Sequence, residues 1–79
     1  MLVNVRIYAT LCRYVPGVFA GTPIEMELPD GASVADLLER LEIPAREVKI
    51  AFVNGRTRSP DWLLKSGDEA GIFPPTGGG

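Results

Sequence analysis

The residues best suited to take part in a reaction lie at the C-terminal end of the sequence, where two prolines and a threonine precede Gly77, Gly78 and Gly79. Glycine has no Cβ, so such a segment can enter a channel too narrow for any side chain, while the prolines hold its base extended. At about 3.3 Å per extended residue, residues 74–79 reach roughly 20 Å. The pattern predicts an arm that delivers the Gly79 carboxylate into another protein's active site. An ordinary glycine-rich terminus has the same composition, and composition alone weighs the two interpretations equally.

Few other residues could support catalysis. The 79 residues include one cysteine, Cys12, and no histidine. The commonest general base is therefore absent, as is a set of Cys and His ligands for a metal. The sequence around Cys12 supplies no evident base, so we interpret Cys12 as a small apolar residue of a turn or of the core. We expect no bound cofactor, no metal and no self-contained active site.

Charge and hydropathy exclude further classes. Eight basic and ten acidic residues give a net charge of −2 without a basic block, which argues against nucleic-acid binding. No apolar run approaches the roughly 18 residues of a membrane span, and the N-terminus lacks the layout of a signal peptide. We expect a cytoplasmic protein that binds neither nucleic acid nor membranes.

Two strands are expected near the N-terminus, because apolar and polar residues alternate there. In residues 2–9 the expected inward face carries Val3, Val5, Ile7 and Ala9. Residues 23–28 alternate in the same way and predict a second strand, antiparallel to the first. Residues 10–22 between them are interpreted as a turn or short helix followed by a loop.

One helix and two further strands follow. Ser33 is suited to cap a helix whose apolar stripe consists of Val34, Leu37, Leu38 and Leu41 and whose length is limited by Pro44. Residues 49–53 predict a buried strand that enters a tight turn, residues 57–64 are irregular, and residues 69–73 predict the last strand. One helix on one face of a mixed four- to five-stranded sheet predicts an α+β domain, the β-grasp or ubiquitin-like fold. We expect this domain over residues 1–75 and a glycine tail over residues 76–79.

The end of the chain, GDEAGIFPPTGGG over residues 67–79, resembles the end of the MoaD/ThiS family of sulfur carrier proteins. It looks most like the small subunit of molybdopterin synthase, in which a Gly-Asp-Glu turn leads to a strand, a Phe-Pro-Pro step and a terminal Gly-Gly. The opening strand and the apolar helix face also fit, so the resemblance covers essentially the whole chain.

The resemblance implies a reaction cycle at Gly79. An adenylyltransferase similar to the ubiquitin-activating enzyme would use ATP to convert the Gly79 carboxylate to an acyl-adenylate, and sulfur from a persulfide donor would convert it to a thiocarboxylate. The tail would then enter the large subunit of molybdopterin synthase and donate sulfur for molybdopterin. Gly78 and Gly77 would give access to the channel, and the family pattern requires only the last two glycines. ATP and any zinc would belong to the activating enzyme.

The resemblance also implies docking on the sheet face away from the helix. Partner-binding candidates are Tyr8, Phe73, Pro74 and Pro75, with Phe52 or its neighbours beside them. The alternative for Phe52 and Phe73 is that they are core residues. Two functional alternatives also stay open, a sulfur carrier for thiamin or another pathway and a ubiquitin-like modifier that joins its carboxyl group to lysine amines.

Overall fold

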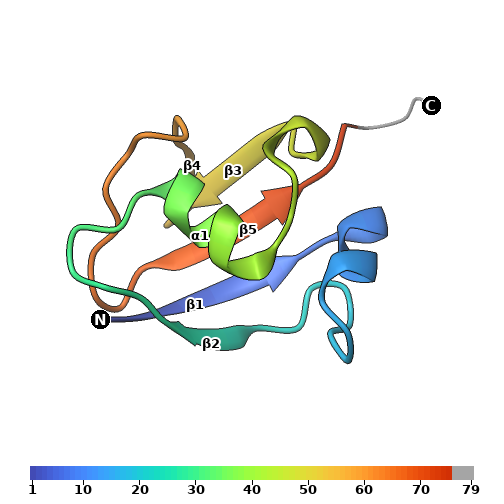
Figure 1. Ribbon diagram of the computed structural model, residues 1–79, viewed down its shortest axis with the longest axis horizontal. Helices are drawn as coiled ribbons and strands as arrows, with labels where there is room; N and C mark the ends of the chain where they lie inside the picture. The colour runs from blue at the N-terminus through green and yellow to red at the C-terminus, as the bar shows by residue number, and fades with distance from the viewer. Residues whose placement is uncertain (76–79) are drawn as a thin grey trace.

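The structure is a computed structural model that describes residues 1–75. Over this range a mixed sheet of five strands carries one α-helix on one face (Figure 1). The sheet order is β2-β1-β5-β3-β4, with β1 and β5 parallel in the centre and the other neighbours antiparallel. The elements in chain order are β1 (Leu2–Ile7), the 3-10 helix η1 (Ala9–Tyr14), β2 (Ile24–Glu27), α1 (Val34–Leu41), the 3-10 helix η2 (Ala45–Glu47), β3 (Ile50–Val53), β4 (Arg56–Thr57) and β5 (Glu69–Phe73). This is the predicted β-grasp architecture.

The parallel pairing of β1 and β5 determines where the chain leaves the sheet. Asn4 lies opposite Glu69 and Ile7 opposite Ile72, so the C-terminal ends of both strands lie at the same end of the sheet. Tyr8 follows the first strand there, and Phe73 ends the second. Two segments far apart in sequence therefore meet at the point where residues 74 and 75 depart.

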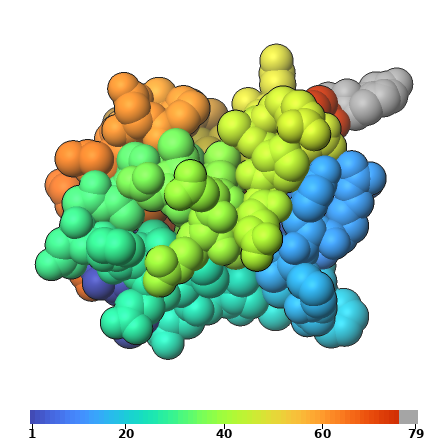
Figure 2. All heavy atoms as spheres, in the orientation of Figure 1, coloured from blue at the N-terminus to red at the C-terminus, as the bar shows by residue number. Residues whose placement is uncertain are grey.

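The core lies between the sheet and α1. Alternate residues of β1 and β5 are buried, and they meet the apolar stripe predicted for the helix, Val34, Leu37, Leu38 and Leu41. On this side the sheet is largely hidden beneath α1 and the segments around it (Figure 2). The opposite face of the sheet carries the other half of each alternation and has no helix over it among the elements of residues 1–75.

Helix α1 begins with the predicted cap. The Ser33 hydroxyl accepts a hydrogen bond from the Asp36 N–H at 3.2 Å, and the Asp36 carboxylate accepts one from the Ser33 N–H at 2.8 Å. This reciprocal capping box satisfies two N–H groups that have no partner inside the helix. The helix ends at Leu41, followed by Glu42 in a left-handed conformation and then by Pro44.

Replacing Ser33 by alanine is expected to lower the free energy of unfolding by about 1 kcal/mol, because an N-terminal N–H of α1 loses its acceptor. Urea denaturation measures the loss. The matched control is Ser66→Ala, since Ser66 is exposed and makes no side-chain hydrogen bond within the described residues. Equal stability of the two variants would contradict a stabilising role for the cap.

Several predicted boundaries were wrong. Ala9 is exposed and starts η1 with a positive φ of 54°, so the first strand ends at Ile7 rather than at residue 9. The second strand covers Ile24–Glu27, shorter than the predicted 23–28, and β3 alternates between half-buried and buried residues instead of being buried throughout. The two-residue strand β4 was not predicted. No helix within residues 1–75 is long and apolar enough to cross a membrane.

Candidate functional site

The predicted partner-binding residues converge at one edge of the open sheet face. Tyr8 follows β1 in extended conformation, so its side chain lies on the opposite face from the buried Ile7. Phe73 is the last residue of β5, and both rings are half-buried. Pro74 is half-buried and Pro75 exposed. The predicted reactive residues Gly77, Gly78 and Gly79 lie outside the described residues, as does the predicted tail of residues 76–79.

Three rings form the aromatic cluster of Tyr8, Phe52 and Phe73. The Tyr8 and Phe73 rings are stacked, with centroids 4.2 Å apart and planes 6° from parallel. The Phe52 ring meets Phe73 edge-on, with centroids 5.5 Å apart. Both geometries are favourable for aromatic pairs. Phe52 and Phe73 are not members of the buried core, so of the two positions considered for them the open face is the correct one.

The aromatic cluster forms one end of a groove on the open face. Beyond the rings, the groove is lined by small or apolar residues and by four polar side chains, Asn4, Arg6, Asn54 and Glu69. Arg6 makes no ion pair within residues 1–75. The groove therefore presents an apolar aromatic surface beside the start of the tail and the Arg6 guanidinium from β1.

Two glycines, Gly71 and Gly21, lie beside the rings. A Cβ at Gly71 would lie 3.4 Å from Cε1 of Phe73 and 3.5 Å from Cε2 of Tyr8, and a Cβ at Gly21 would lie 3.5 Å from Cε1 of Tyr8. Gly21 also has a φ of +77°, which favours glycine. Gly71 and Gly21 were not singled out from the sequence. The alternation of β5 was the available signal for Gly71, because it places residues 69, 71 and 73 on one face.

Main-chain hydrogen bonds hold both sides of the tail's starting point. The Phe73 carbonyl accepts from the Lys49 N–H at 2.9 Å, and the Ile72 carbonyl accepts from the Tyr8 N–H at 3.1 Å. Pro74 and Pro75 cannot donate to a ladder, so the sheet ends at residue 73. The chain is thus secured up to Phe73 by neighbours on either side.

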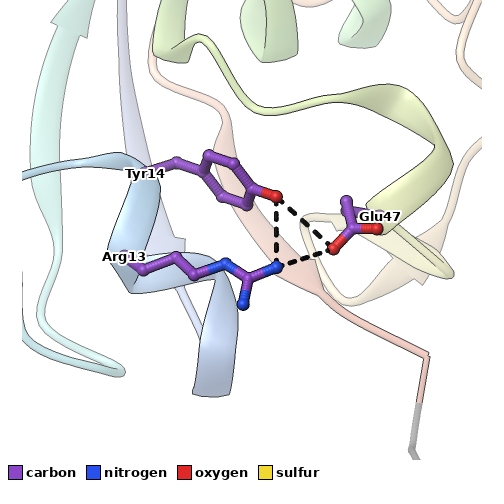
Figure 3. Close-up of polar contacts among 3 residues, drawn as sticks. All are labelled: Arg13, Tyr14 and Glu47. Atoms are coloured by element: carbon purple, nitrogen blue, oxygen red, sulfur yellow. Dashed lines mark hydrogen bonds and ion pairs between the residues drawn. The ribbon is translucent and has the colours of Figure 1, made fainter.

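A polar cluster of Arg13, Tyr14 and Glu47 joins η1 to η2 (Figure 3). The Arg13 guanidinium donates to the Tyr14 hydroxyl at 3.2 Å and to Glu47 Oε1 at 3.0 Å, and the Tyr14 hydroxyl donates to the same carboxylate oxygen at 3.4 Å. The Tyr14 hydroxyl, and secondarily the Glu47 charge, raise the pKa of the Arg13 guanidinium. Arg13 is therefore a permanent cation, and the exposed ion pair links the two 3-10 helices with little expected net stabilisation.

The first residues of β5 are held by a network that the sequence did not reveal. The buried Asp68 carboxylate accepts from the Asn54 side-chain amide at 2.9 Å and from the Lys65 N–H at 2.8 Å. Asn54 in turn accepts from the Glu69 N–H at 3.0 Å and donates its own N–H to the Glu69 carbonyl at 2.8 Å. The network joins the β3–β4 turn to the start of β5 and helps to set the register that ends at Phe73.

Cys12 lies in η1, half-buried, and its thiol donates a hydrogen bond to the Ile7 carbonyl at 3.4 Å. This fits the interpretation of a small residue in a turn packed against the core. Among the residues that the structure describes, no group of three or more His, Cys, Asp and Glu side chains could hold a metal ion.

Comparison with known structures reveals close relatives of this fold. A Pyrococcus furiosus chain assigned as molybdopterin converting factor subunit 1 is 32% identical with a TM-score of 0.74, over 96% of this chain and 99% of that one. Haloferax volcanii SAMP1, a small archaeal modifier protein, is 22% identical with a TM-score of 0.75 over the whole of both chains. A Helicobacter pylori structure holds subunits 1 and 2 of molybdopterin-converting factor in complex, and its matching chain is 19% identical with a TM-score of 0.63 over the whole of both.

The last two likenesses show the fold alone, because their identities are low. A comparison with curated proteins found no match. The sequence of residues 5–79 matches the ThiS family, a match that includes the β-grasp domain and runs through the final glycines. The chain therefore belongs to the MoaD/ThiS family of sulfur carrier proteins.

Proposed function

We propose that the protein carries sulfur as a thiocarboxylate at Gly79 and donates it for molybdopterin synthesis as the small subunit of molybdopterin synthase. The observation that carries this proposal is the ThiS-family match through residue 79, on a chain 32% identical to a molybdopterin converting factor subunit 1. The carrier supplies the reacting carboxyl group, and its partners supply the catalytic groups. Because the cycle consumes ATP, we place it in the cytoplasm.

The chemistry requires activation, since a carboxylate is a poor electrophile. A carboxylate oxygen of Gly79 attacks the α-phosphorus of ATP on the activating adenylyltransferase, and pyrophosphate leaves. The terminal sulfur of a donor persulfide then attacks the acyl carbon and AMP leaves, which gives an acyl disulfide. A second thiol of the donor system then attacks the sulfur that belongs to the donor. The S–S bond of the acyl disulfide breaks, a new disulfide forms within the donor system, and the Gly79 thiocarboxylate is released. No cofactor needs to reside on the carrier itself.

The open face is the proposed docking surface for both partners, the adenylyltransferase and the synthase large subunit. Partially exposed aromatic rings at the start of the tail are suited to act as interface anchors, and Pro74 and Pro75 extend this surface toward the tail. Arg6 in the same groove is available for a partner carboxylate. The Helicobacter pylori complex of subunits 1 and 2 supports a two-subunit arrangement for a protein of this fold.

An intact-mass experiment tests the proposal. The protein is incubated with the adenylyltransferase, ATP and a persulfide donor, and the expected product carries one oxygen-to-sulfur exchange located at Gly79 by fragmentation. Addition of the synthase large subunit and cyclic pyranopterin monophosphate should return the C-terminus to a carboxylate. Absence of the exchange under these conditions would contradict the proposal.

A ubiquitin-like modifier is the second candidate, favoured by the full-length structural likeness to a small archaeal modifier protein. It would use the same adenylate but transfer the Gly79 acyl group to a lysine amine. The same incubation, supplemented with cell proteins, separates the candidates, because a modifier yields conjugates in which Gly79 is joined to a lysine side chain by an isopeptide bond; after tryptic digestion that lysine carries residues 66–79. A thiamin-type carrier is distinguished by purification with a thiazole synthase instead of the synthase large subunit.

A further inference from the structure

The stacked pair at the edge of the open face has its rings in contact within this chain. Tyr8 and Phe73 present their faces to each other at 4.2 Å, so neither ring offers that face to a partner. Phe52 meets Phe73 from another side at 5.5 Å. The Phe73 ring is thus contacted by two other rings of the same chain, which restricts its orientation.

Tyr8 is itself held through its main chain. Gly21 and Gly71 lie beside its ring, and a Cβ on either would be at ordinary van der Waals distance from the ring, 3.5 Å. Its backbone N–H donates to Ile72, and its carbonyl accepts from the Leu11 N–H at 3.2 Å, which begins η1. These two main-chain hydrogen bonds fix the backbone that carries the ring, so the stacked ring of Tyr8 can support Phe73.

We infer that Tyr8 is a positioning residue, whose ring orients Phe73 and thereby sets the direction in which Pro74 and Pro75 leave the sheet. Phe73 is the last residue with ladder hydrogen bonds, and its carbonyl is held by Lys49. Misplacement by about 1 Å can cost 100-fold in an oriented reaction, so the direction at Phe73 bears on activation at Gly79.

Hydrogen exchange on the full chain, without any partner, tests the positioning directly. Tyr8→Leu removes the stack and is expected to speed exchange of the Lys49 amide about tenfold, because its acceptor on Phe73 moves more freely. The Arg58 amide, which donates to Ala51 in another part of the sheet, should keep its wild-type exchange rate and reports that the domain is folded. Tyr8→Phe keeps the stack and should leave both rates unchanged. Unchanged Lys49 exchange in Tyr8→Leu would overturn the inference.

A second variant disturbs the Tyr8–Phe73 ring pair without changing either of these residues. Gly71→Val leaves Tyr8 in place but fills the space beneath both rings, and it should also speed exchange at Lys49 but not at Arg58. If Lys49 keeps its wild-type exchange rate in this variant, the ring pair does not hold Phe73.

The consequence for activity rests on the proposed function and is measured separately. With saturating carrier, Tyr8→Leu should lower the kcat of ATP–pyrophosphate exchange by the adenylyltransferase about tenfold, and Tyr8→Phe should restore it. A residue that only contacts the partner would raise KM and leave kcat unchanged, a result that would overturn the positioning role. Hydrogen exchange is measured on the free chain and involves neither adenylation nor sulfur transfer. Its result therefore stands even if the proposed function fails.

Discussion

Removing Gly78 and Gly79 is expected to abolish thiocarboxylate formation while the β-grasp domain stays folded. Each extended residue spans about 3.3 Å, so the shortened arm places its carboxyl group roughly 7 Å short of the ATP α-phosphorus. A displacement far smaller than this costs about 100-fold in an oriented reaction, so no thiocarboxylate should be detected by intact mass. The core residues and all strands of the described domain lie within residues 1–73, so thermal unfolding should be unchanged.

Gly77→Ala is the matched control for this deletion. It changes the tail but keeps its length, and the family pattern requires only the final two glycines. It should retain at least part of the thiocarboxylate formation that the deletion loses. A deletion variant that still forms the thiocarboxylate would show that Gly79 is not the reactive end.

Most of the fold could be predicted because local patterns and global packing agree in this chain. Period-two alternation identified β1 and β2, the helical stripe with its Ser33 cap identified α1, and the proline pair after residue 73 marked the end of β5. These patterns record which side chains are buried, and burial follows directly from hydrophobicity. Prediction failed where tertiary contacts determine the backbone conformation or the strand pairing. Ala9 continues the alternation but takes a positive φ as the chain turns into η1, and β4 is two exposed residues that pair only because β3 is beside them.

The candidate site shows the same division. The alternation of β1 placed Tyr8 on the face opposite Val3, Val5 and Ile7, whereas a core position stayed open for Phe73, and the family resemblance supplied the role of the tail. That the two rings stack could not be predicted, because it depends on the parallel pairing of two strands from opposite ends of the chain. The link between Asn54 and Asp68 was equally hidden. Asn54-Gly55 was recognised only as a turn, and Gly67-Asp68 only as a turn that opens the family motif.

Asp68 connects this hidden network to the stability of the whole domain. Its carboxylate is buried and serves two donors, the Asn54 amide and the Lys65 N–H, from different loops. Its own carbonyl accepts from the Asn4 N–H at 2.9 Å at the start of the β1–β5 pairing. The Asp68 side chain therefore joins the turn after β3 to the loop before β5, and its backbone carbonyl links this network to the central strands.

Replacing Asp68 by alanine is accordingly expected to lower the free energy of unfolding by about 2–3 kcal/mol, since two partly buried donors lose their acceptor. That loss is a large part of the roughly 5–10 kcal/mol expected for a domain of this size. Asp68→Asn keeps one acceptor oxygen and should lose about half as much. The control is Asp61→Ala, because Asp61 is exposed and accepts only from the neighbouring Ser59 hydroxyl, so its urea midpoint should stay near wild type. Equal midpoints for Asp68→Ala and Asp61→Ala would mean that the network does not stabilise the domain, and that the register of β5 depends on apolar packing alone.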